Sequence, residues 1–292
     1  MDFLLNKQYT VLVPILFPLA YLIGGMVIFC TLTAMGRQPR VHDNKETEQL
    51  VFMSRFLHWM VRPVERAAIR LKITPNQVTV TSLLVCASAG AALATGHLAV
   101  ATWSYAIAGI LDIVDGRLAR ATGKQSNSGA FLDSVLDRWG ELAVFGGMAW
   151  LVRDTWALGA VLVAMGASMM VSYTRARGES LGVVTSGGAM QRPERIVLVV
   201  AGCLAAAIAD ANPFFTEYVP TVLGTSVAIV GALSAMTAFG RLRAGYRMLD
   251  GKSPSPRAQA EAFSDDDTPV PEQPVARVLK FRPGDRATGT DS

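Results

Sequence analysis

The stretch LDIVDGRLARATGKQSNSGAFLDSVLDRWGE occupies residues 111–141 and carries four aspartates in a fixed pattern. Asp112 and Asp115 are three residues apart, and Asp133 and Asp137 are four residues apart. Side chains at these spacings lie on one face of a helix. Each pair is therefore predicted to project from one side of its own helix, with a short basic loop between the two helices.

Long uncharged stretches surround this pattern. Residues 73–111 contain no charged side chain, and about 20 apolar residues suffice for one helical membrane span. The composition agrees, because 51% of the residues are hydrophobic and only 17% are charged. We predict an all-α membrane protein with six spans after residue 72. The first of them opens with Thr74-Pro75-Asn76, which is typical of a helix N-cap followed by a first-turn proline. The last four begin near 128, 155, 193 and 218, and the final span ends at Gly240.

Two segments precede these spans. Residues 8–36 carry no charge and are too long for a signal peptide, so we predict a retained, extra N-terminal transmembrane helix. Residues 49–71 mix apolar side chains with arginines at helical spacing, which is typical of an amphipathic helix on the membrane surface. A soluble helix packed on a partner is the alternative. The predicted divisions are 1–37 (extra helix), 38–72 (cytosolic loop and interfacial helix), 73–250 (six-span catalytic domain) and 251–292 (disordered cytosolic tail).

Basic residues set the expected orientation. Lys and Arg number eight in 37–73 and four in each of 117–138, 175–195 and 241–252, whereas the other side has only Lys7 and Arg153. Cytoplasmic loops carry such an excess, so the aspartates are expected at the cytosolic face of the plasma membrane. The basic excess is explained by loops facing anionic lipid, and we expect no nucleic-acid partner.

Four carboxylates gathered at membrane depth would repel one another unless cations compensate them. Hard divalent ions prefer oxygen ligands, and two ions would neutralise four aspartates. Such a pair can stabilise the attacking and leaving oxygens of a phosphoryl displacement. Two alternatives are ordinary ion pairs with nearby Arg and Lys residues, and a cation pathway of a transporter, since intramembrane carboxylates also mark such pathways.

The spacing Asp112-x2-Asp115-Gly116-x2-Ala119-Arg120-x8-Gly129-x3-Asp133-x3-Asp137 resembles the signature of the CDP-alcohol phosphotransferase family at every fixed position. The resemblance covers roughly residues 50–248. It takes in the surface helix and implies a six-helix core, to which the leading helix and the tail are additions. It also implies a homodimer in the lipid bilayer, and transfer of the phosphatidyl group of CDP-diacylglycerol to a small alcohol with release of CMP.

The same resemblance implies roles for individual residues. The four signature aspartates would bind two Mg²⁺ ions, or Mn²⁺, and Asp137 would also take the proton of the acceptor hydroxyl. The residues expected to hold the CDP moiety are Asn76, Thr79, Gly116, Arg120, Ser126 and Gly129.

The acceptor is predicted from the cytosolic loop expected between the fourth and fifth spans, residues 172–196, SYTRARGESLGVVTSGGAMQRPERI. The arginines of this segment could bind an anionic acceptor. They are Arg175, Arg177, Arg192 and Arg195. The RARGES and RPER runs, with LDSVLDR around Asp133, resemble the inositol-phosphate branch of the family, so a polyol phosphate such as inositol phosphate is expected. Glycerol 3-phosphate is the alternative acceptor.

Overall fold

The computed structural model describes residues 20–21, 23–35, 48–185, 188 and 190–250, and within them every regular element is a helix. A short helix covers Ile23–Ala34. The elements that follow are α2 (Glu48–Arg70), α3 (Pro75–Ala94), α4 (Leu98–Ala121), α5 (Asn127–Leu151), α6 (Ala157–Ser180), α7 (Arg192–Ala211), the 3₁₀ turn η1 (Thr216–Tyr218) and α8 (Val219–Leu249). Residues 8–19, 22 and 36 of the predicted leading span and the whole tail from 251 lie outside the described residues.

Four segments in the described part are long and apolar enough to cross a membrane: α3, α4, α6 and the η1–α8 segment. The prediction of an all-α membrane protein is therefore confirmed. Helices α5 and α7 have 25 and 20 residues, but charged side chains lie within both. The uncharged part of α7, residues 196–209, is shorter than the ~20 residues of a full span. Six spans stay a prediction.

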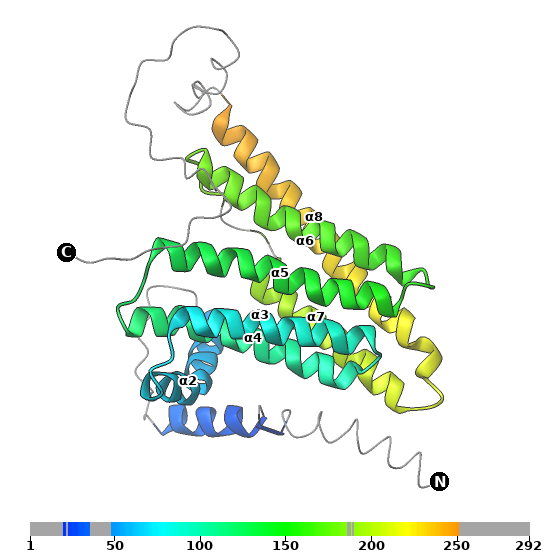
Figure 1. Cartoon of the computed structure of the whole chain (residues 1–292), viewed down its shortest axis with the longest axis horizontal. Helices are drawn as coiled ribbons and strands as arrows, with labels where there is room; N and C mark the ends of the chain where they lie inside the picture. The colour runs from blue at the N-terminus through cyan, green and yellow to red at the C-terminus, as the bar shows by residue number, and fades with distance from the viewer. Residues whose placement is uncertain (1–19, 22, 36–47, 186–187, 189, 251–292) are drawn as a thin grey trace, which may run out of the picture. The chain divides into compact units, whose positions relative to one another are not determined.

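Helix α3 packs along both α4 and α5, α6 packs along α8, and α7 contacts α4 and α8 (Figure 1). Two glycines allow α3 and α5 to approach at backbone distance. A Cβ at Gly90 would collide with the carbonyl of Ala143, and a Cβ at Gly147 would collide with the backbone of Gly90. This close crossing fixes how α3 and α5 lie beside each other.

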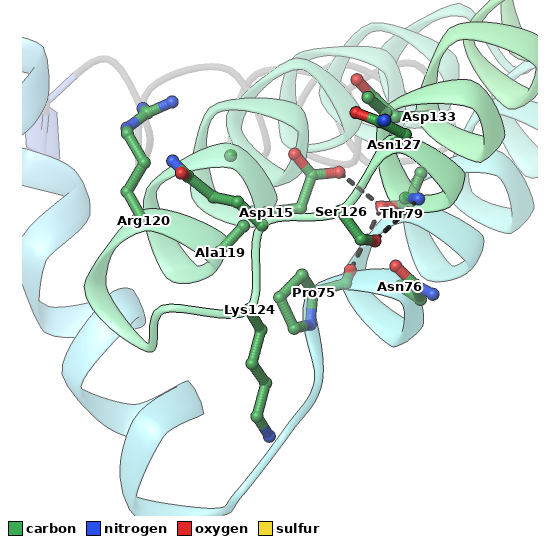
Figure 2. Close-up of a pocket in the computed structure, with 14 residues that line it drawn as sticks. Pro75, Asn76, Thr79, Asp115, Ala119, Arg120, Lys124, Ser126, Asn127 and Asp133 are labelled. Atoms are coloured by element: carbon green, nitrogen blue, oxygen red, sulfur yellow. Dashed lines mark hydrogen bonds between the residues drawn. The ribbon is translucent and has the colours of Figure 1, made fainter.

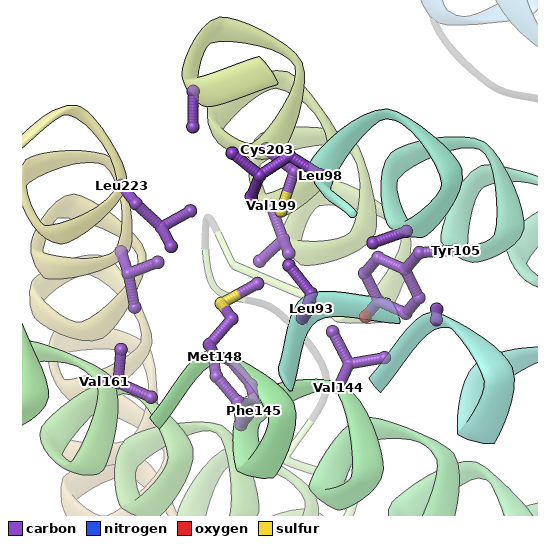
Figure 3. Close-up of a cluster of buried hydrophobic side chains, with 14 of the residues drawn as sticks. Leu93, Leu98, Tyr105, Val144, Phe145, Met148, Val161, Val199, Cys203 and Leu223 are labelled. Carbon is purple, nitrogen blue, oxygen red and sulfur yellow. The ribbon is translucent and has the colours of Figure 1, made fainter. Parts of the chain in front are cut away.

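The main apolar core joins six of the described helices. Figure 3 shows side chains of α3, α4, α5, α6, α7 and α8 converging on it. Phe145 and Met148 of α5 are almost completely buried there, and Tyr105 of α4 is about as deeply placed. Because this core holds the helices together, the start of α3, the end of α4 and the start of α5 can carry polar groups.

The helix ends beside the aspartates have well-defined caps. Thr74 and Gln77 form a capping box at the start of α3, and Pro75 occupies the first turn, as the Thr74-Pro75-Asn76 sequence predicts. Ser126 caps α5 by accepting a hydrogen bond from the backbone N–H of Gly129 at 3.0 Å. Between α4 and α5 the chain turns at Gly123, whose φ of +67° favours glycine.

Helix α8 continues beyond its predicted end at Gly240 and stops at Leu249. The basic residues that follow Gly240 extend the helix instead of ending it. Arg241 is buried against α6 and donates a hydrogen bond of 2.8 Å to the carbonyl of Val171. This long-range contact is absent from any local sequence pattern, which explains why the predicted boundary fell short.

Candidate active site

Three of the four signature aspartates converge. Carboxylate oxygens of Asp112 on α4, and of Asp133 and Asp137 on α5, all lie within 4.8 Å of one another. The i, i+4 spacing on α5 places its two carboxylates on the face directed toward α4. The structure thus brings side chains from both predicted pairs to one point between the helices.

Asp115 does not belong to this group of three, although the sequence predicts that it shares the ions. It is buried one turn further along α4, where its Oδ2 accepts a hydrogen bond of 2.8 Å from the hydroxyl of Thr79 on α3. Asp115 and Asp133 nevertheless line the same cavity. The carboxylate of Asp115 is therefore held at the edge of the cluster by a neighbouring helix.

The cluster has the chemistry of a divalent-cation site. All of its donors are carboxylate oxygens, which hard cations prefer. Oδ1 of Asp133 is buried and has no hydrogen-bond partner within the described residues. The guanidinium of Arg192 contacts Asp112 and lies 2.8 Å from Asp137. The clustered carboxylates thus attract a positive charge of the chain itself. The residues present therefore fit a divalent metal.

A cavity of about 420 Å³ opens beside the cluster, between the start of α3, the end of α4 and the start of α5. Figure 2 shows Thr79 and Asp115 facing each other in its wall, with Asp133 and Asn127 on the α5 side. The six residues predicted to hold the nucleotide all line it: Asn76, Thr79, Gly116, Arg120, Ser126 and Gly129.

The glycine at position 129 keeps this cavity open. A Cβ at Gly129 would lie 3.1 Å from the Ser126 hydroxyl and 3.4 Å from Oδ1 of Asn76, closer than most side-chain contacts. Lys124 and Asn127 also line the cavity, although the sequence did not indicate either as a ligand-binding residue. Lys124 lies in the loop after Asp112 and Asp115, and Asn127 is the first residue of α5; these positions between the two aspartate pairs were the available signal.

A second cavity, of about 580 Å³, lies on the other side of the cluster, among α5, α6, α7 and α8. Its wall is rich in guanidinium groups, contributed by Arg138, Arg175, Arg192, Arg195 and Arg241. Asp133 and Asp137 also line it, so Asp133 borders both cavities. A ligand in either cavity can thus reach the same carboxylate.

Three of the four arginines predicted to bind the acceptor line this second cavity, and Arg177 does not. Residues 175–180 continue helix α6 instead of forming a loop. Positions two apart on a helix point in different directions, so Arg175 faces the cavity while Arg177 is exposed elsewhere. Arg138 and Arg241 were not predicted to line this cavity. In the sequence Arg138 is only the neighbour of Asp137, and Arg241 only the first basic residue after the last predicted span.

Arg195 is anchored deep in the wall of the second cavity. It is 1% exposed, and it forms two hydrogen bonds, of 2.7 and 3.1 Å, with the carboxylate of Glu141 on α5. Its remaining terminal nitrogen, Nη1, is buried without a hydrogen-bond partner among the described residues. Glu141 was not among the predicted site residues. It lies four residues after Asp137, one helical turn along α5, and this spacing is the signal that could have indicated its position.

Comparison with known proteins agrees with this geometry. Residues 72–237 match the model of the CDP-alcohol phosphatidyltransferase family, so the chain belongs to that family. A phosphatidylinositol phosphate synthase of Corynebacterium glutamicum is 36% identical over 152 residues, covering 49% of this chain and 68% of the relative.

Solved structures of the Mycobacterium tuberculosis phosphatidylinositol phosphate synthase are also similar. The structure with manganese and citrate has a TM-score of 0.57 and 27% identity, covering 64% of this chain and 88% of that chain. The structure with CDP-DAG bound has a TM-score of 0.56 and 28% identity, covering 64% and 93%. The protein described here is thus a membrane-bound CDP-alcohol phosphatidyltransferase.

Proposed function

We propose that this enzyme transfers the phosphatidyl group of CDP-diacylglycerol to inositol phosphate and releases CMP. The observation that carries the proposal is the pair of cavities that meet at Asp133. One is lined by all six residues of the predicted nucleotide site, and the other is lined by five arginines. The phosphatidylinositol phosphate synthases among its relatives support this choice of acceptor.

In this proposal the first cavity holds the CDP moiety. The carboxamide of Asn76, the guanidinium of Arg120 and the ammonium of Lys124 offer donors to ribose, cytosine and phosphate oxygens. The cavity opens at the ends of helices that are apolar enough to span the bilayer. The acyl chains can therefore remain in lipid while the pyrophosphate reaches the aspartates.

The aspartates hold two divalent cations, Mg²⁺ or Mn²⁺, in this proposal. The bound manganese in the M. tuberculosis synthase structure and the all-oxygen donor set support a divalent ion. Asp112, Asp133 and Asp137 would bind one ion, and Asp115 with Asp133 would complete the site for the second. When bound, the ions neutralise the carboxylates and the charge that develops on the phosphoryl oxygens.

The residues of the chain supply the remaining chemistry. Asp137 borders the second cavity, where it can accept the proton of the acceptor hydroxyl. The acceptor oxygen forms a bond to the phosphorus that carries the diacylglycerol, while the bond from that phosphorus to the CMP oxygen breaks. The Thr79 hydroxyl holds Asp115 in place, and Ser126 fixes the start of α5. Positioning of this kind is a major contribution to phosphoryl transfer.

Arginines of the second cavity bind the acceptor phosphate in this proposal. Arg195 is the best placed, because its free nitrogen is buried in the wall and Glu141 fixes its orientation. Arg138 and Arg175 are more exposed and can reorient toward a ligand. Glycerol 3-phosphate also carries a phosphate, so the same arginines suit it, and only the shape of the polyol separates the two acceptors.

We place the active site at the cytosolic face of the plasma membrane. The excess of Lys and Arg in segments 37–73, 117–138, 175–195 and 241–252 supports this orientation. A homodimer, as the family resemblance implies, stays part of the prediction.

An acceptor screen tests the proposal. The purified full-length protein in lipid nanodiscs is supplied with CDP-diacylglycerol, Mg²⁺ and one of inositol 1-phosphate, inositol, glycerol 3-phosphate or serine, and released CMP is measured. CMP release that requires inositol 1-phosphate, stops with EDTA and disappears in Asp137→Asn is expected. Preference for glycerol 3-phosphate would reassign the acceptor, and release that persists in EDTA would contradict the metal assignment. A transporter would release no CMP with any acceptor.

A further inference from the structure

Helix α2 packs against α4 (Figure 1), and the contact includes apolar side chains and the ion pair between Glu65 and Arg117. Its Val61 and Ala68 are buried with Val114 and Leu118 of α4 and with Val78 of α3. Between the two apolar positions of α2 lies Glu65, which faces Arg117. Two guanidinium nitrogens, Nε and Nη2, donate to Oε2 of Glu65 at 2.9 and 2.7 Å.

The ion pair lies on the back of the helix segment that forms the nucleotide cavity. Gly116 and Arg120 line the cavity, whereas Arg117 does not and is directed to α2. The same division holds on α3, where Val78 enters the contact with α2 and Thr79 binds Asp115. Each helix thus presents one face to the cavity and the other to α2.

The pair is also shielded from water. The side chains of Arg117 and Glu65 are 17% and 15% exposed, far less than the exposed pair Arg153–Asp154 at 52% and 84%. Loss of one partner from a desolvated pair is costly, because the other charge stays unpaired, whereas exposed pairs contribute little. The Glu65–Arg117 pair is therefore expected to stabilise one register of α2 on α4.

The opposite face of α2 is suited to a membrane surface. Val64 and Ile69 are 43% and 44% exposed there, next to the exposed basic residues Arg66 and Arg70. The outer face of α2 can therefore lie in the membrane interface while its inner face packs on α4. In this position α2 lies between the lipid and the helix that forms part of the cavity wall.

We propose that Glu65 and Arg117 are positioning residues, which hold α4 against α2 so that the wall formed by Gly116 and Arg120 binds CDP-diacylglycerol. The inference rests on the proposed function in taking CDP-diacylglycerol as the ligand of the first cavity. Neither residue touches the substrate. Breaking the pair weakens binding of this lipid nucleotide and leaves the chemical step at the aspartates largely unchanged.

A charge exchange tests the inference. Full-length Glu65→Arg, Arg117→Glu and the double variant are assayed in nanodiscs for kcat and for the KM of CDP-diacylglycerol, and CDP-diacylglycerol binding is measured directly. Each single variant is expected to raise KM and Kd by about tenfold with kcat changed less than about threefold, and the double variant is expected to recover most of the loss. The matched control exchanges the exposed Arg153–Asp154 pair and should change nothing.

Several results would overturn the inference. They are single variants with unchanged KM and Kd, a double variant no better than the singles, or losses equal to those of the control exchange. Should a reversed charge prevent folding, Glu65→Gln is measured in the same way, and an unchanged Kd there has the same meaning. The proposed function is judged separately on the wild-type protein. If the wild type binds CDP-diacylglycerol but forms no product with inositol phosphate, only the proposed acceptor is wrong. If it does not bind CDP-diacylglycerol, both the proposed function and the positioning role are wrong.

Discussion

Nη2 of Arg192 on α7 lies 2.8 Å from Oδ1 of Asp137 on α5, and the same guanidinium also contacts Asp112. A cation of the chain thus compensates two of the carboxylates that the sequence assigns to metal. The two residues are 55 positions apart in the sequence. Arg192 therefore competes with a divalent cation for the carboxylates of Asp112 and Asp137.

Replacing Arg192 by Gln should therefore destabilise the metal-free protein and increase the stabilisation gained from metal. Without the guanidinium, Asp112 and Asp137 repel each other until a divalent ion binds. We expect the Tm without metal to fall by a few degrees, about 3 °C, and the rise on adding Mn²⁺ to exceed that of the wild type. Thermal unfolding in detergent with EDTA or Mn²⁺ measures both.

Arg177→Gln is the matched control for this measurement, because Arg177 is exposed and lies outside both cavities. Equal Tm values for the wild type and Arg192→Gln in EDTA would show that the contact has no energetic value.

Thr79 provides a second prediction, since its hydroxyl donates to the buried carboxylate of Asp115 at 2.8 Å. Thr79→Val keeps the shape of the side chain and removes the donor. A hydrogen bond to a charged group contributes about 1.5–3 kcal/mol, so we expect kcat/KM for CDP-diacylglycerol to fall about tenfold or more. Thr79→Ser, which keeps the hydroxyl, should stay close to the wild type. Equal losses in the Val and Ser variants would instead indicate a packing effect.

Local sequence patterns predicted much of the fold and site. The spacing of the aspartates gives their shared faces, because the helical repeat is fixed by backbone geometry. Thr74 and Pro75 predicted the start of α3, and the structure forms the capping box there. The six nucleotide residues came from the family resemblance and not from such a pattern, and they line one cavity because they belong to three helix ends that the same core holds together.

Contacts between distant segments could not be predicted in this way. The partner of Arg195 is Glu141, and no local pattern connects residues 54 positions apart. Arg175 and Arg177 looked equivalent as loop residues, and only the continuation of α6 to Ser180 separates their directions. The hydrogen bond from Thr79 to Asp115 likewise depends on the packing of α3 on α4, and the spacing of the aspartates carries no information about that packing.

The Glu141–Arg195 pair gives a third prediction. Both side chains are almost fully buried, so Glu141→Gln leaves a guanidinium charge without a counterion. Breaking a buried pair in this way costs about 3–5 kcal/mol. We expect a large loss of stability in chemical unfolding of the detergent-solubilised protein. The double variant Glu141→Gln/Arg195→Met removes the uncompensated charge and should be more stable than Glu141→Gln alone. A double variant that is less stable than the single one would contradict this account.

The crossing of α3 and α5 gives the last prediction, because two adjacent glycines on α5 differ in their surroundings. A Cβ at Gly147 would collide with the backbone of Gly90, whereas a Cβ at Gly146 meets nothing within 4 Å. Both Gly→Ala changes alter the intrinsic helix preference of α5 equally, so their difference isolates the helix contact. Gly147→Ala should force α3 from α5, at a cost of about 1–3 kcal/mol.

Thr79 lies on the same helix as Gly90, so a displaced α3 also moves the hydroxyl that binds Asp115. We therefore expect Gly147→Ala to lower both Tm and the affinity for CDP-diacylglycerol, and Gly146→Ala to lower neither. Thermal unfolding and CDP-diacylglycerol binding on the two variants measure this. If Gly147→Ala lowers Tm while binding stays at the wild-type level, the crossing stabilises the fold but does not set the position of Thr79 at the nucleotide cavity.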